Sequence, residues 1–258
     1  ILMSDKWPIG APIEDLDTPA VILDIDVCRR NIDRMADFFS DKPCKLRPHF
    51  KNHKCTTLMR SQLAREAVGV TCAKVSEAEV LVEAGFADIL IANQVVGPHK
   101  AQRLLSLLDR AEVRVAVDCE ANCRQLSHLA AAAGKTIGCL VEVEIGMKRC
   151  GVLPDGPCLE IARLLDTLPG VRFDGLQGFE GHTVLIEDDD QRNSATREAM
   201  ELLTGTGRYI EEHGLPVPII SGGGTGTYDL SGTLDGMDEI VAGTYPTLDW
   251  PYKNGPPE

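Results

Sequence analysis

The chain has 258 residues, of which 43% are hydrophobic, and its formal net charge is −13. This length and composition suffice for one large α/β barrel or two smaller domains, each with a substantial core. The negative charge argues against nucleic acids and anionic membranes as partners, because both attract basic surfaces. No apolar run reaches the roughly 18 to 20 residues of a membrane span, and residues 1–10 lack the layout of a signal peptide. We therefore expect a cytoplasmic protein.

Apolar runs rich in Val and Ile alternate with amphipathic segments along the whole chain. The predicted strands are 19–26, 45–51, 68–73, 88–94, 113–118, 138–146, 171–179 and 217–224. Apolar residues at three- and four-residue spacing predict helices at 28–40, 76–85, 98–110, 120–134, 158–169 and 194–214.

Continuous apolar strands that alternate with helices are typical of a parallel sheet covered by helices. Eight such units favour closure into a (β/α)8 barrel, with an open doubly wound sheet as the alternative. We expect the barrel to occupy residues 1–240, and residues 241–258 to form the start of a C-terminal β-domain or a tail. In such barrels the chemistry gathers at the carboxyl ends of the strands.

The segment 221–229, SGGGTGTYD, follows the last predicted strand. Glycines let backbone N–H groups converge on an anion, and hydroxyl side chains add donors, as in the phosphate sites of barrel enzymes. The alternative is an ordinary glycine-rich turn. The candidate anion-binding residues are Ser221, Gly222, Gly223, Gly224 and Thr225.

The segment 47–54, RPHFKNHK, places two histidines and two lysines at the end of the second predicted strand. A partly desolvated lysine near other cations has a lowered pKa, which suits an amine that forms a Schiff base. Lys51 alternates in phase with His49 and His53, so the three side chains can share one face of an extended segment. A solvated basic loop, or a metal site that uses His49, His53 and Cys55, is the alternative.

Two further strand ends carry polar side chains that could contact a ligand. Arg149 follows the strand predicted at 138–146 and could donate to a ring nitrogen or a carboxylate, although an exposed loop arginine is the alternative. Gln177, Glu180 and His182 lie at the end of the strand predicted at 171–179.

Taken together, these segments resemble the D-threonine aldolase and D-serine dehydratase family, whose barrel is of the alanine racemase N-terminal type. The resemblance rests on LDTPAVILDID, RPHFKNHK, VGVTCAKVSEAEVL, VEVEIGMKRCGV, GLQGFEGH, SGGGTGTYD and VAGTY, which occur in this order over most of the chain. Members of this family use pyridoxal 5′-phosphate (PLP), and the resemblance implies the same cofactor here.

The family motif places the Schiff-base lysine at Lys51 and not at Lys54. It likewise places the contact to the pyridine nitrogen at Arg149, further cofactor contacts at Gln177, and the phosphate contacts at the glycine loop and Tyr245. A base must also remove a hydroxyl proton in a retro-aldol reaction. His182 and His49 are the candidates, since neutral imidazole accepts a proton near pH 7.

The chain departs from the family in two respects. Phe179 stands where relatives often carry an aromatic hydroxyl, so a role for that phenol is in doubt. Relatives also continue into a β-domain that carries a divalent metal (Mn, Mg or Zn) and completes the active site in a homodimer. That β-domain is expected to be missing or truncated here, and no metal ligands are identifiable in this sequence.

The resemblance predicts a PLP-dependent lyase that acts on small D-β-hydroxy amino acids. The first choice of reaction is retro-aldol cleavage of D-threonine-like substrates to glycine and an aldehyde. The second choice is dehydration of D-serine to pyruvate and ammonia. An amino-acid racemase, a non-catalytic PLP-binding protein and a phosphate-binding barrel enzyme without PLP are the other readings.

Overall fold

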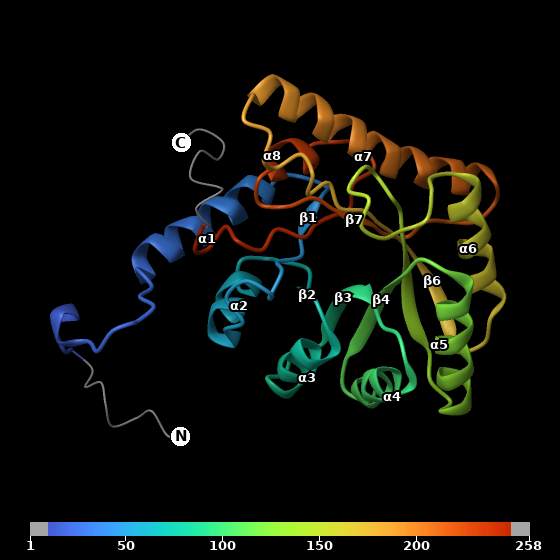
Figure 1. Cartoon of the computed structure of the whole chain (residues 1–258), viewed down its shortest axis with the longest axis horizontal. Helices are drawn as coiled ribbons and strands as arrows, with labels where there is room; N and C mark the ends of the chain where they lie inside the picture. Colours follow the sequence, from blue (N-terminus) through green and yellow to red (C-terminus); the bar gives the residue numbers. More distant parts are fainter. Residues whose placement is uncertain (1–9, 249–258) are drawn as a thin grey trace.

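The structure, a computed structural model, describes residues 10–248, which form a barrel of eight parallel strands (Figure 1). The strands are β1 Lys45–Leu46, β2 Val70–Cys72, β3 Asp88–Gln94, β4 Glu112–Val117, β5 Ile137–Glu142, β6 Val171–Gln177, β7 Ile220–Gly222 and β8 Glu239–Ile240. The α-helices are α1 Ile25–Phe39, α2 Thr56–Leu63, α3 Val75–Glu83, α4 Pro98–Leu107, α5 Glu120–Ala132, α6 Gly156–Thr167, α7 Asp189–Glu212 and α8 Tyr228–Ser231.

Regular parallel pairing runs in the order β1-β8-β7-β6-β5-β4-β3-β2. An irregular pairing closes the remaining seam: His49 bridges Thr71, and the N–H groups of Phe50 and Thr71 donate to Thr71 and Pro48 carbonyls at 2.7 and 2.9 Å. The barrel predicted from the alternating pattern is therefore confirmed, and the open sheet is excluded.

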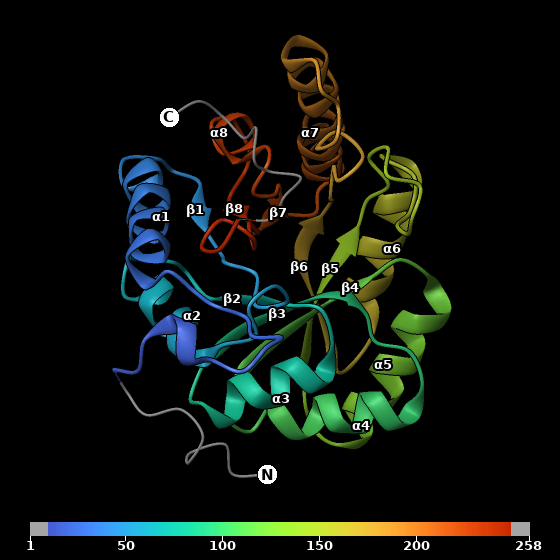
Figure 2. The same ribbon diagram turned by 60° about the vertical axis from the view of Figure 1, so that its left-hand side comes forward.

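The helices lie around the outside of the strands, as Figure 2 shows. The apolar face of α1 illustrates how they pack, since Cys28, Ile32, Met35 and Phe39 recur at helical spacing and are all buried. None of the helices within residues 10–248 is both long and apolar enough to cross a membrane.

The first predicted strand, 19–26, is wrong. Residues 20–24 pair with no described strand, and the Val21 side chain is fully exposed. The Asp24 carboxylate instead accepts hydrogen bonds from the N–H groups of Asp26 and Val27, so helix α1 begins at Ile25. The strand that completes the set of eight is β8, a two-residue strand that the hydrophobic pattern did not predict.

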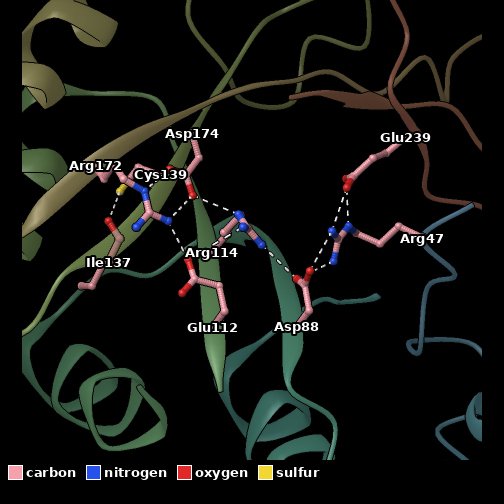
Figure 3. A network of polar contacts seen from close by, with 9 residues as sticks. All are labelled: Arg47, Asp88, Glu112, Arg114, Ile137, Cys139, Arg172, Asp174 and Glu239. Carbon is pink, nitrogen blue, oxygen red and sulfur yellow. Dashed lines mark hydrogen bonds and ion pairs between the residues drawn. The ribbon is translucent and has the colours of Figure 1, made fainter. Parts of the chain in front are cut away.

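A chain of ion pairs fills the interior of the barrel near the amino ends of the strands (Figure 3). Arg47, directly after β1, is buried and lies between Glu239 of β8, at 2.7 Å, and Asp88 of β3, at 2.8 Å. Arg114 of β4 continues the chain from Asp88 to Asp174 of β6, with both contacts at 2.9 Å. Four strands and the segment after β1 are thus linked through charged side chains where many barrels use apolar layers.

Two glycines make room for these ion pairs. A Cβ atom on Gly69 would collide with the Arg47 guanidinium, and one on Gly138 would collide with the Asp174 carboxylate and lie 2.9 Å from Cγ of Arg114. The charged layer therefore needs the absence of side chains at these two positions.

Gly138→Ala is expected to lower the free energy of unfolding by about 1 to 3 kcal/mol, the usual cost of overpacking a filled interior. Gly156→Ala is the control, because a Cβ atom at Gly156, in the first turn of α6, meets no atom within 4 Å. Chemical denaturation of both variants measures the difference. Equal stability of the two variants would contradict the steric account of the charged layer.

Candidate active site

A cavity of about 350 Å³ opens near the carboxyl ends of the strands. Its walls include His49 and Lys51 after β1, Arg149 after β5, and Gln177 and Phe179 at the end of β6. These residues are far apart in the sequence and meet because parallel strands direct their carboxyl ends to one rim. The structure thus brings together five of the residues considered from the sequence.

Lys51 lies in the turn after β1, with its ammonium nitrogen 5.6 Å from the centre of the Phe179 ring. Burial lowers the pKa of Lys51, and the positive charge of Arg149 lowers it further, while Glu77 acts in the opposite direction. The amine therefore loses its proton more readily than an ordinary lysine, as a nucleophile that attacks a carbonyl requires.

His49 is 5% exposed and lies directly beside the turn that carries Lys51. Burial lowers its pKa to about 3, with smaller contributions in the same direction from interactions with Lys51 and His53. The ring is therefore neutral at physiological pH. Its Nδ1 atom accepts a hydrogen bond from the Lys51 backbone N–H at 3.2 Å, which fixes the geometry of the turn and leaves the proton on Nε2.

Arg149 enters the cavity from the segment after β5 and lies 3.6 Å from the Glu142 carboxylate. Gln177 donates to Oε2 of Glu142 at 2.7 Å, and the Cys150 thiol donates to Oε1 at 3.4 Å. Burial raises the pKa of Glu142, and the Arg149 charge opposes that shift. Sequence reasoning missed Glu142, although a glutamate inside a fully buried strand was an available signal.

The glycine loop follows β7, where the Ser221 carbonyl accepts a hydrogen bond at 3.1 Å from the N–H of Gly178, a residue of the cavity wall. Gly223 has a positive φ of 72°, a conformation that glycine adopts readily. The buried Ser221 hydroxyl has no partner among the described residues, and the N–H groups of Thr225 and Gly226 bond to none of them either. These free donors suit a bound anion.

Tyr245 lies apart from this cavity. Its side chain is 4% exposed, and its hydroxyl accepts a hydrogen bond from Gln62 of α2 at 2.6 Å. The Thr225 hydroxyl oxygen accepts hydrogen bonds from the backbone N–H groups of Thr244 and Tyr245 at 3.0 and 3.2 Å. The side chains of Tyr245 and Thr225 thus hold the segment after β8 in place. A phosphate contact by either residue remains a prediction.

The other histidines of the predicted site also lie outside the lining of this cavity. His182 is exposed, and its ring packs on Gly146, where a Cβ atom would come within 2.7 Å. His53 is bonded through Nε2 to Gln62 at 3.1 Å, and its Nδ1 accepts from the Cys55 N–H at 3.1 Å. Within residues 10–248 no group of three or more His, Cys, Asp or Glu side chains is placed to hold a metal ion.

A lysine of lowered pKa, a fixed arginine and a loop with free N–H donors fit the aldehyde, ring nitrogen and phosphate of PLP. Residues 23–245 match the family of the alanine racemase N-terminal domain. The chain belongs to this family. Within it, the chain groups with the D-threonine aldolases and 3-hydroxy-D-aspartate aldolases of the fold type III PLP enzymes, as its motifs predicted.

The chain is similar over most of its length to longer proteins. It is 37% identical to a D-threonine aldolase from Arthrobacter sp over 243 residues, which are 94% of this chain and 64% of the relative. It is 33% identical over 245 residues to a 3-hydroxy-D-aspartate aldolase from Paracoccus denitrificans, covering 94% of this chain and 63% of the relative. The chain thus spans less than two thirds of these relatives.

The crystal structure of a D-threonine aldolase from Filomicrobium marinum superposes with a TM-score of 0.94 at 40% sequence identity. The match covers 98% of this chain and 68% of that one. The barrel described above therefore has the same architecture as the corresponding part of that aldolase.

The charges around Lys51 predict opposite effects of two substitutions on its pKa. Arg149→Met removes a nearby cation and should raise the pKa of Lys51, whereas Glu77→Gln removes an anion and should lower it further. NMR titration of the ¹³C-methylated lysine amines measures both shifts. A Lys51 pKa that moves in the same direction in both variants would show that these charges do not control the amine.

Proposed function

We propose that this barrel binds PLP and serves a lyase that acts on D-β-hydroxy amino acids. The leading reaction is retro-aldol cleavage of D-threonine-like substrates to glycine and an aldehyde. One observation carries the proposal: the Lys51 amine, with its lowered pKa, shares a cavity with Arg149, and a glycine loop with free N–H donors begins at Ser221, which is bonded to Gly178 of the cavity wall. The similarity of the chain to proteins named as aldolases of D-threonine and 3-hydroxy-D-aspartate, at 33–40% sequence identity, supports the choice of substrate class.

When bound, PLP supplies an electron sink for the bond that breaks at the substrate Cα atom. Lys51 would provide the amine that holds the cofactor aldehyde. Arg149 would donate to the ring nitrogen. The Glu142 carboxylate lies 3.6 Å from Arg149, and a hydrogen bond from Gln177 at 2.7 Å holds Glu142 in turn.

The two candidate bases differ in their surroundings. A pKa near 3 makes His49 a weak proton acceptor at neutral pH, so its role is to hold the Lys51 turn. His182 is exposed and beside Gly146, three residues before Arg149, and we assign proton removal from the substrate hydroxyl to it. By family resemblance we also expect a homodimer, and a divalent metal if a further β-domain is present in the whole protein.

Lys51→Ala should abolish the visible absorbance band of a lysine Schiff base with added PLP. Lys54→Ala is the matched control, because Lys54 lies three residues away and pairs with Glu77 at 3.3 Å. The band of the native chain should also disappear on borohydride reduction. A band that survives in Lys51→Ala, or that is absent from the native chain, would overturn the assignment of the cofactor to Lys51.

Product analysis separates the competing reactions. With D-threonine the PLP-loaded chain should release acetaldehyde and glycine, and L-threonine should not react. His182→Asn should lower kcat by roughly 100-fold or more, the usual contribution of a general base. Release of ammonia and a keto acid would favour the dehydratase instead, inversion at Cα the racemase, and a Schiff base without any turnover a binding role.

A further inference from the structure

Glu180, which follows β6, lies behind the glycine loop with no exposed surface. Its Oε1 atom accepts a short hydrogen bond from the Thr227 hydroxyl and another from the Ser231 hydroxyl at 3.3 Å. Two hydroxyl donors, one from the end of the loop and one from α8, therefore converge on one side chain.

The N–H groups of the loop differ in their partners. The Gly224 N–H donates to the Thr227 hydroxyl at 3.2 Å, which in turn donates to Glu180. The next two N–H groups, those of Thr225 and Gly226, bond to no described residue. Glu180 thus holds the loop through Thr227 and Gly224, next to two N–H groups that remain free donors.

Glu180 is itself held firmly. Its carbonyl accepts hydrogen bonds from the Thr183 N–H at 2.9 Å and the Thr183 hydroxyl at 3.0 Å. Thr196 of α7 bonds to that hydroxyl at 2.9 Å, and both threonines are buried. The support of the loop therefore runs from the long helix α7 through residues 180–183, and a rigid support preserves the geometry of a binding site.

We propose that Glu180 is a positioning residue that shapes the 221–227 loop into the phosphate cradle, an inference that rests on the proposed PLP function. Glu180 does not touch the ligand in this account. It acts by holding Thr227 and, through Thr227, Gly224, so its removal should weaken recognition of the phosphate and leave recognition of the pyridine ring unchanged.

One oxygen of Glu180 makes its side-chain contacts to the loop and α8. The Oε1 atom accepts both hydroxyl hydrogen bonds, and the Oε2 atom has no partner among the described residues. Burial raises the pKa of the carboxyl group, against hydrogen bonds from Thr227 and Ser231 that lower it. An amide keeps the same acceptor oxygen, so glutamine should replace this group.

The test measures the affinities of PLP, pyridoxal and inorganic phosphate for the native chain, Glu180→Ala and Glu180→Gln. We expect Glu180→Ala to weaken PLP and phosphate binding by roughly ten-fold or more, the effect of losing one hydrogen bond to a charged group. Pyridoxal, which lacks the phosphate, should bind equally to all three chains. Glu180→Gln should bind PLP within about two-fold of the native chain.

Two further variants make the result specific. Thr227→Val removes the hydroxyl that joins Gly224 to Glu180, so it should reproduce the selective loss seen in Glu180→Ala. Glu187→Ala, at an exposed position between β6 and α7, should leave the affinities for PLP, pyridoxal and phosphate unchanged.

Equal losses of PLP and pyridoxal in Glu180→Ala, or unchanged affinity for PLP, would overturn the positioning role. A loss in Glu180→Gln as large as in Glu180→Ala would also overturn it. Failure of the PLP proposal is distinguishable: the native chain would then form no Schiff base, while inorganic phosphate would still report on the loop and on Glu180. A native chain that binds neither PLP nor phosphate would overturn both proposals.

Discussion

The ion pairs of Arg47 are the interaction on which the remaining structure depends. The guanidinium joins the segment directly after β1 to β8 through Glu239 and to β3 through Asp88, across the seam where the β1–β2 pairing is irregular (Figure 3). Burial disfavours its charge, but the two carboxylates outweigh burial and raise the pKa of Arg47, so it stays protonated. Removing one partner of such a buried pair typically costs about 3 to 5 kcal/mol.

This anchor has a direct consequence for the active site, because Arg47 and Lys51 belong to the same short segment. Arg47 fixes the segment inside the barrel, the His49 backbone N–H donates to Ala242 at 3.0 Å, and the His49 ring holds the Lys51 turn. The amine is thus positioned by contacts spread over the barrel. Buried carboxylates support other parts of the site in the same manner. Glu142 contacts Arg149, and Glu180 accepts a hydrogen bond from Thr227 of the glycine loop.

The sequence predicted the parts of this account that local patterns control. The strand predicted at 88–94 matches β3 residue for residue, and Gly134 and Gly214, both with positive φ, follow the ends of α5 and α7. The family motifs located Lys51, Arg149 and the glycine loop. The predicted strand 19–26 failed because a β-strand needs a pairing partner, which an apolar pattern does not report.

Other features depended on contacts between distant segments and had no local signal. The Glu239 carboxylate belongs to a two-residue strand, and its role appears only when Arg47, 192 positions earlier, lies beside it. The family motif predicts a phosphate contact for Tyr245, while the hydrogen bond between its hydroxyl and Gln62 appears only in the folded chain. The proposed roles of Glu142 and Glu180 likewise follow from what surrounds them after folding.

The central claim is that PLP bonds to the Lys51 amine in the cavity it shares with Arg149. Borohydride reduction of the PLP-loaded chain, followed by proteolysis and peptide mass spectrometry, tests this claim most directly. The account predicts one reduced pyridoxyl adduct, located on Lys51. An adduct on Lys54 or another lysine, or a scatter of substoichiometric adducts over several lysines, would contradict it.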